Sequence, residues 1–118
     1  MATASRLIDT SALEAALAEF SRERDWDVHH SPRNLLLALT GELGELAEIF
    51  QWKTEAESAA IMRGSEAEHV RQEIADVLLY LMRLAMVLGV DVDAAVRDKM
   101  ALNALKYPPK YPRGTAGP

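Results

Sequence analysis

Apolar residues recur every three or four positions along most of this 118-residue chain, which is the spacing of an amphipathic helix. The pattern predicts four helices and gives no strand signal. We therefore expect an all-α fold, built as a four-helix bundle. The predicted helices run from Ser11 to about Trp26, from Ser31 to about Trp52, from Ser65 to about Gly89 and from Asp91 to about Lys106.

Residues that favour helix ends support these boundaries. Ser31 can cap the second helix, because Pro32 then takes the first helical position, where a missing N–H is harmless. Gly89 suits the end of the third helix, and Asp91 can cap the fourth. Two further start signals have the spacing of a capping box: Ser11 with Glu14, and Ser65 with Glu68.

The sequence divides into one domain with two short flanks. We expect an N-terminal extension over residues 1–10, a helical domain over residues 11–108 and a tail over residues 109–118 that is rich in proline and glycine. The weakly patterned residues 53–64 are expected to connect two helices and to have some helical character. One compact unit is therefore predicted.

The third helix is apolar on most of its faces. From Val77 to Leu88 nearly every position is apolar, with Tyr80, Met82 and Arg83 as partial exceptions. A helix that is apolar all round must be covered all round, and four helices around one core cannot do this. We therefore expect a homo-oligomer with the third helix near its centre.

Two acidic pairs interrupt the apolar stripes of the second and third helices. Glu42 and Glu45 lie three residues apart, as do Glu73 and Asp76, so each pair lies on one side of its helix. Glu42 and Glu73 fall among the positions expected to face inward. If the two helices pack antiparallel, the two pairs can face one another.

Buried carboxylates need compensation for the hydration they lose. These acids could be protonated, could pair with bases such as Arg71, Arg33 or Lys99, or could hold a metal ion. A ligand set made only of oxygens suits Mg²⁺ or Mn²⁺ far better than zinc. Gly41 and Gly44 each weaken a helix by about 1 kcal/mol relative to alanine, which suggests that backbone or ligand comes close to them.

Composition excludes several classes of protein. The absence of cysteine rules out disulfides, thiolate metal sites and cysteine nucleophiles, and it favours a reducing compartment such as the cytoplasm. A net charge of −5 without a basic block argues against polymeric nucleic acid as a partner. No apolar run reaches the roughly 18 residues of a membrane helix, and residues 1–10 lack the apolar core of a signal peptide. We therefore expect a soluble cytoplasmic protein.

Several motifs resemble a known family. Residues 32–39 read PRNLLLAL, residues 41–48 read GELGELAE and residues 50–53 read FQWK, and the similarity continues through Glu73, Asp76 and Tyr80 to residues 99–108. Over roughly residues 13–108 the chain resembles the MazG-like all-α nucleoside triphosphate pyrophosphohydrolases, and within them the branch that hydrolyses dCTP. The resemblance implies a Mg²⁺-dependent tetramer that splits dCTP, or a modified dCTP, into dCMP and pyrophosphate and so cleans the nucleotide pool.

The same resemblance implies roles for individual residues. On chemical grounds, a carboxylate that the metal does not saturate could orient the attacking water as general base, and Glu42 and Glu45 are the candidates. Plainer interpretations are that the tryptophans fill the core and that Lys99 extends along its own helix toward water. The implied metal ligands are Glu42, Glu45, Glu73 and Asp76. The implied substrate contacts are Trp26, His30, Trp52, Tyr80, Lys99 and Asn103.

One position departs from the family pattern. Where vertebrate members of this branch have a histidine that faces the base, this chain has Leu17. Base preference therefore stays open between dCTP, dUTP and a broad set of triphosphates. The alternative outside enzymology is a helical interaction module whose acidic surface binds a basic partner.

Overall fold

The computed structural model describes residues 5–110, and all of the regular structure in that range is helical. It contains five α-helices and two short 3₁₀ helices, so the predicted number of four helices is wrong. Residues 111–118, which make up most of the predicted tail, lie outside the described range. The elements are α1 (Ser11–Glu23), η1 (Asp27–His29), α2 (Pro32–Phe50), α3 (Glu55–Ala59), η2 (Ile61–Arg63), α4 (Ala67–Leu88) and α5 (Val92–Lys106).

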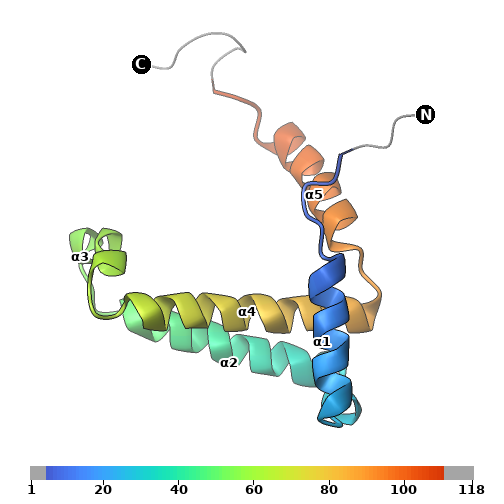
Figure 1. Ribbon diagram of the computed structural model, residues 1–118. Helices are drawn as coiled ribbons and strands as arrows, with labels where there is room; N and C mark the ends of the chain where they lie inside the picture. The colour runs from blue at the N-terminus through green and yellow to red at the C-terminus, as the bar shows by residue number, and fades with distance from the viewer. Residues whose placement is uncertain (1–4, 111–118) are drawn as a thin grey trace.

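Helices α2 and α4 run antiparallel along one another and form the body of the fold (Figure 1). Helix α1 crosses one end of this pair, and α3 with η2 lies at the other end (Figure 1). Helix α5 leaves the end of α4 and stands away from the pair (Figure 1). A single chain therefore does not form the closed four-helix bundle that the sequence predicts.

The divergence of α5 has two local causes. Gly89 ends α4 in the left-handed region, with φ of 71°, and this turn sends the chain off the α4 axis. Along α5, the stripe that begins with Val92 and Val96 turns polar at Lys99, so the helix has no continuous apolar face to lay on the α2–α4 pair.

Two of the predicted helix starts are confirmed. The Ser31 hydroxyl accepts a hydrogen bond of 3.1 Å from the backbone N–H of Asn34, and Pro32 is the first residue of α2. The Asp91 carboxylate accepts a bond of 3.0 Å from the backbone N–H of Ala94 at the start of α5. These caps fix where α2 and α5 begin.

The predicted capping box at Ser11 is wrong. Ser11 lies inside the first turn of α1, and its backbone N–H donates to the Asp9 carboxylate at 3.0 Å. Thr10 is the residue that precedes the helix, and its hydroxyl donates to the Glu14 carboxylate at 2.7 Å. Thr10 therefore makes no side-chain cap to the helix backbone, and Asp9, two residues before Ser11, accepts the Ser11 N–H instead.

The predicted capping box at Ser65 is also wrong, because α4 begins at Ala67 without a side-chain cap. A complete capping box occurs instead in the connection before it. The Thr54 hydroxyl accepts from the Glu57 backbone N–H at 3.1 Å, and the Glu57 carboxylate accepts from the Thr54 N–H at 2.9 Å. This box starts α3, so the helical character expected of residues 53–64 is confirmed.

Residues ahead of α1 are tied to α5. The backbone N–H groups of Leu7 and Ile8 both donate to one oxygen of the Asp93 carboxylate, at 2.7 and 3.0 Å. Arg97 donates to the other oxygen at 2.9 Å. These bonds hold the pKa of Asp93 below its usual range, and the bond from Ile8 has the largest effect. The charged Asp93 carboxylate therefore links the residues before α1 to α5.

Apolar contacts hold the two ends of the α2–α4 pair. At the α3 end, Ile49, Ile61 and Val70 form a buried cluster. At the opposite end, Leu35 of α2 and Met82 of α4 are buried. The stretch between these ends contains the acidic residues of both helices. None of the described helices combines the length and apolarity needed to cross a membrane.

Candidate active site

Three of the four predicted acids meet between α2 and α4. Glu42 from α2 and Glu73 and Asp76 from α4 each offer one carboxylate oxygen, and these oxygens all lie within 4.8 Å of one another. Glu73 is buried, while Glu42 and Asp76 are half-buried. The expectation that antiparallel packing makes the acidic pairs face one another is confirmed for these three residues, called the acidic triad below.

The acidic triad contains carboxylate oxygens without partners. Glu42 Oε2 and Glu73 Oε2 are both buried, and neither has a hydrogen-bond partner among the described residues. A buried, unpaired carboxylate oxygen is costly, and it marks a place where a cation fits. The donor set, made of carboxylate oxygens alone, suits Mg²⁺ or Mn²⁺.

The bases considered as alternative partners do not neutralise the triad. Arg71 pairs with Glu68 at 2.8 Å on the outer face of α4. Arg33 and Lys99 form no salt bridge with these acids in the described part of the chain. The one basic neighbour found there is His69, whose Nε2 lies 3.5 Å from Glu73 Oε1 and whose side chain is mostly exposed. Neutralisation by arginine or lysine is therefore not what brings the three acids together.

Burial raises the pKa of Glu42 to about 7, and the nearby carboxyl groups of Glu73, Glu45 and Asp76 push it in the same direction. At neutral pH the site therefore holds a proton on Glu42 for much of the time when no cation is present. A divalent cation would replace that proton, because it stabilises the charged form of every carboxylate around it.

Glu45 occupies a different position from the other predicted ligands. It is exposed and lies outside the triad. It lines an open depression together with Glu48, Ile49, Glu66 and His69. Glu45 is near enough to affect the pKa of Glu42, yet its own carboxylate is not among those that converge.

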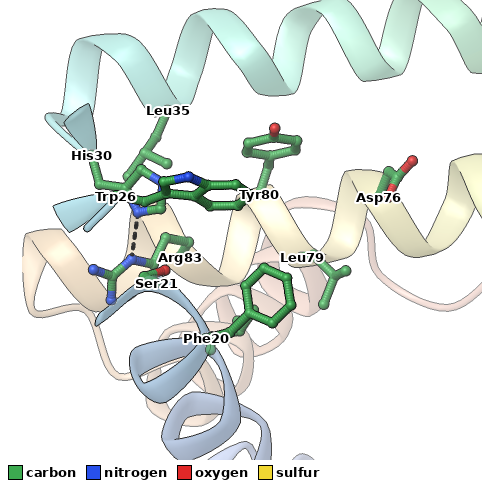
Figure 2. Close-up of a pocket in the computed structure, with 10 residues that line it drawn as sticks. Phe20, Ser21, Trp26, His30, Leu35, Asp76, Leu79, Tyr80 and Arg83 are labelled. Atoms are coloured by element: carbon green, nitrogen blue, oxygen red, sulfur yellow. Dashed lines mark hydrogen bonds between the residues drawn. The ribbon is translucent and has the colours of Figure 1, made fainter. Parts of the chain in front are cut away.

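An aromatic pocket of about 280 Å³ adjoins the acidic triad. Its wall includes Phe20, Trp26, Leu35 and Tyr80, and Asp76 belongs both to this wall and to the triad (Figure 2). Pockets for drug-sized ligands are typically about 300–1,000 Å³. This one lies just below that range, which suits a single ring system better than a whole nucleotide.

A tight turn after α1 places Trp26 in this pocket. Asp25 adopts the left-handed conformation, with φ of 56°, and the backbone N–H of Trp26 then donates to the Ser21 carbonyl at 3.0 Å. The chain is thereby folded back, so the Trp26 ring packs edge-on against Phe20, with centroids 5.6 Å apart. His30 follows after η1, its ring centroid 6.2 Å from that of Trp26 (Figure 2).

The pocket contains a basic residue, Arg83, whose role the sequence pattern did not predict. Arg83, one turn after Tyr80 on α4, donates from Nε to Nδ1 of His30 at 3.0 Å (Figure 2) and from Nη2 to the Asp27 carboxylate at 2.8 Å. The available signal was its interruption of the apolar stretch 77–88, three residues from Tyr80 and so on the same helix face.

Other predicted substrate contacts lie away from the pocket. Trp52 follows α2 at the α3 end of the fold, and 88% of its surface is exposed. Lys99 and Asn103 are exposed on α5, the helix that stands away from the α2–α4 pair (Figure 1). Three of the predicted base contacts, Trp26, His30 and Tyr80, therefore lie together in the pocket of a single chain.

The close approach expected at Gly41 and Gly44 does not occur within the chain. A Cβ built on either glycine has no heavy atom within 4 Å, leaving aside its own helix backbone and adjacent residues. The face of α2 that carries both glycines is therefore open, and nothing within a single chain explains why alanine is not used there.

Comparison with known proteins gives a consistent result. The MazG-like family profile matches residues 38–114. Over 100 residues, 84% of this chain, the sequence is 50% identical to dCTP pyrophosphatase 1 of Rattus norvegicus and 48% identical to dCTP pyrophosphatase 1 of Homo sapiens. The chain spans 59% of the length of each of these relatives.

A solved structure extends the similarity to the fold. The crystal structure of a pyrophosphatase from Archaeoglobus fulgidus DSM 4304 superposes with a TM-score of 0.79 at 36% identity, covering 92% of this chain and all of that one. The family match includes the Glu42, Glu73 and Asp76 positions that converge between α2 and α4. This chain belongs to the MazG-like family.

Proposed function

We propose that this protein is a Mg²⁺-dependent nucleoside triphosphate pyrophosphohydrolase that acts in the cytoplasm on the nucleotide pool. It would convert dCTP, or a modified dCTP, and water into dCMP and pyrophosphate. The observation that carries the proposal is the position of Asp76, which joins a carboxylate cluster able to hold a cation to an aromatic pocket the size of a base. Phosphates and base of one nucleotide can thus be held side by side.

The acidic triad is the proposed metal site, occupied by Mg²⁺ or by Mn²⁺. Its two unpartnered buried oxygens and its all-oxygen donor set support this assignment. A divalent ion bound there polarises a phosphoryl group and makes water easier to deprotonate.

Glu45 and Glu42 remain the two candidates for the general base. Glu45 is exposed beside the triad, outside the set of converging oxygens, so its carboxylate is available to orient a water molecule. Glu42 has a pKa of about 7, which is well placed for accepting a proton near neutrality, but it loses that property if it binds the metal directly.

The pocket residues Trp26, His30 and Tyr80 are the proposed base contacts. Stacking on an aromatic face contributes about 1–3 kcal/mol per base and tolerates different bases, so polar groups must decide which base fits. dCTP is the first substrate to test because the relatives at about half identity are dCTP pyrophosphatases by name. Leu17 lines the pocket without a polar atom, so it contributes no hydrogen bond to that choice.

The proposed assembly is a homotetramer. The chain has a radius of gyration of 18.4 Å, whereas about 13.5 Å is expected for a compact domain of this length. Apolar side chains are exposed on α4 at Ile74, Leu78 and Leu81. Exposed apolar surfaces of this kind are typical of protein–protein interfaces, and we propose that further copies of the chain cover them.

Assembly also accounts for the predicted substrate contacts that lie far from the pocket. Trp52, Lys99 and Asn103 cannot reach the pocket of their own chain, because they lie at the α3 end of the fold or on α5. We propose that these three residues act on the pocket of a neighbouring copy, where Trp52 stacks on the base and Lys99 meets phosphate.

The decisive experiment measures pyrophosphate release from each common and modified nucleoside triphosphate, with Mg²⁺ and with EDTA. Hydrolysis is expected only with the metal and fastest with dCTP or a modified dCTP. Equal rates across the bases, or a preference for dUTP, would show that dCTP is not the preferred substrate, although the protein would still be a pyrophosphohydrolase. No release from any triphosphate at micromolar enzyme would overturn the proposal in favour of a binding module.

A further inference from the structure

Arg83 joins α4 to the turn that carries His30. Its guanidinium donates to His30 Nδ1 at 3.0 Å through Nε and to the Asp27 carboxylate at 2.8 Å through Nη2 (Figure 2 shows the bond to His30). The Arg83 side chain is only 14% exposed, and it lies in the wall of the aromatic pocket. The bonds span 53 and 56 residues of sequence, so they are tertiary links rather than local ones.

The bond to Arg83 determines which nitrogen of His30 carries the proton. Arginine has only donors and stays protonated in proteins, so His30 Nδ1 must accept with its lone pair. A neutral imidazole has one N–H, which is then on Nε2. His30 is neutral here because burial lowers its pKa, and the charge of Arg83 lowers it further, against the opposing effect of Asp27.

We infer that Arg83 is a positioning residue that holds His30 as its Nε2–H tautomer, which makes His30 a hydrogen-bond donor to an acceptor atom on the edge of a pyrimidine base. Asp27 completes the arrangement by fixing the orientation of the guanidinium. The identity of the ligand rests on the proposed function, whereas the tautomer and its dependence on Arg83 do not.

The composition of the pocket makes this donor consequential. Phe20, Trp26 and Leu79 give the wall a mostly apolar surface, and the polar side chains beside them are Ser21, His30, Asp76, Tyr80 and Arg83. Cytosine offers ring N3 and carbonyl O2 as acceptors along one edge. An Nε2–H donor matches that edge, whereas the opposite tautomer would place a lone pair against another lone pair. Sites built to donate one hydrogen bond discriminate strongly, because a mismatch leaves a buried polar group unpaired.

Nitrogen-15 NMR of the full chain, without nucleotide and near neutral pH, tests the tautomer directly. Long-range proton–nitrogen correlations separate an imidazole protonated on Nε2 from one protonated on Nδ1. We expect His30 to be protonated on Nε2 only. A His29→Asn variant is the assignment control, because His29 is the exposed neighbour and the His30 signals should not move. A His30 ring protonated on Nδ1, or a mixture of tautomers, would overturn the inference.

Two substitutions of similar length test the dependence on Arg83. Arg83→Gln keeps an N–H donor at the same distance along the side chain as Nε, and Arg83→Met keeps the length without a donor. Arg83→Met should give a mixture of tautomers and raise KM for dCTP about fivefold to tenfold, with kcat changed less than about twofold. Arg83→Gln should restore both the tautomer and KM toward wild type.

The outcomes separate this inference from the proposed function. If wild type hydrolyses dCTP while both variants keep the wild-type KM, or both raise KM with an unchanged tautomer, the positioning role is wrong. If wild type hydrolyses no triphosphate, the proposed function is wrong, and so is the assignment of a pyrimidine base as the ligand of His30. The tautomer of His30 and its dependence on Arg83 are then still tested by the NMR spectra. Melting curves show whether each variant folds. If Arg83→Met does not fold, the wild-type NMR spectrum and the Arg83→Gln variant test the positioning role.

Discussion

The carboxylates of Glu42 and Glu73 face each other from two antiparallel helices, and each keeps one buried oxygen without a partner. Two carboxylates in such proximity destabilise the folded protein unless a proton or a cation lies between them. A proton relieves this repulsion, and a metal ion at the proposed site would relieve it as well. The raised pKa of Glu42 reflects the effect of the proton, and the proposed activity requires the metal ion.

Removing one acid of the triad should abolish turnover without unfolding the protein. Glu42→Gln and Asp76→Asn each keep the shape of the side chain but remove a charge from the proposed metal site, so pyrophosphate release should fall by more than about 100-fold. Glu42→Gln should also raise the melting temperature of the metal-free protein, because it relieves carboxylate repulsion. Glu68→Gln, on the outer face of α4, is the matched control and should retain activity. Retained activity in either triad variant removes that residue from its role.

Stability should depend on pH in a way that Mg²⁺ reverses. The pKa of Glu42 is raised from 4.5 to about 7 in the folded protein, so the folded state holds a proton in this interval that the unfolded chain releases. The stabilising contribution is fully present below pH 4.5 and is lost as pH rises through about 7. The metal-free protein should therefore melt at lower temperature at pH 8 than at pH 5, apart from the contributions of other groups.

Differential scanning fluorimetry with Mg²⁺ and with EDTA measures this dependence. The increase in melting temperature caused by Mg²⁺ should be larger at pH 8 than at pH 5, because protons compete with the metal for Glu42. Glu42→Gln is the control, and it should flatten the pH dependence of the metal-free protein. An effect of Mg²⁺ that is equal at both pH values would contradict the assignment of Glu42 as a ligand.

The sequence predicted the elements that depend on local chemistry. The apolar period places α2 and α4 correctly, and the caps at Ser31 and Asp91 follow from side chains that accept from nearby backbone N–H groups. The stop at Gly89 follows from the freedom of glycine to adopt a positive φ. The inward position of Glu42 and Glu73 follows from the same period. The false starts at Ser11 and Ser65 arise because the spacing of a capping box does not by itself require the cap to form: α1 begins directly after Thr10, and α4 begins at Ala67 without any side-chain cap.

The sequence pattern did not predict the tertiary geometry. The direction of α5 depends on the backbone angles of the Gly89 turn, which helical periodicity does not encode. The bonds of Arg83 to His30 and Asp27 join residues more than fifty positions apart. Glu45 stands at the same step from Glu42 as Asp76 does from Glu73, yet Glu45 is exposed and Asp76 joins the triad, so the packing of α2 on α4, and not the spacing, decides which acid faces inward.

Alanine at Gly41 and Gly44 should distinguish a bare helix face from a covered one. Each substitution favours the helix by about 1 kcal/mol, and the chain itself leaves room for the added Cβ. If the face is bare, the melting temperature should rise. We expect instead that the double substitution lowers it and weakens assembly, because close packing by another copy leaves no space for the methyl groups. Light scattering with thermal melts measures both effects, and a more stable variant of unchanged mass would show that no copy packs there.

Trp52→Ala should mainly raise KM. Loss of one aromatic face from the base is expected to raise KM for dCTP roughly tenfold, with little change in kcat, since the acidic triad is untouched. The fold should survive, because 88% of the Trp52 surface is exposed and its truncation opens no cavity within the chain. Trp26→Ala is the comparison within the pocket itself. An unchanged KM for Trp52→Ala would count against any role in stacking.

Mixed oligomers test whether Trp52 serves the pocket of a neighbouring copy. Glu42→Gln subunits lack a working acidic triad but carry Trp52, and Trp52→Ala subunits carry an intact triad. If each site combines the triad of one chain with Trp52 of another, co-refolding the two variants should produce some sites with every group present. A kinetic component with wild-type KM should then appear, which neither variant shows alone. If Trp52 acts only within its own chain, no such component can form, and the mixture should show the high KM of Trp52→Ala at every ratio of subunits.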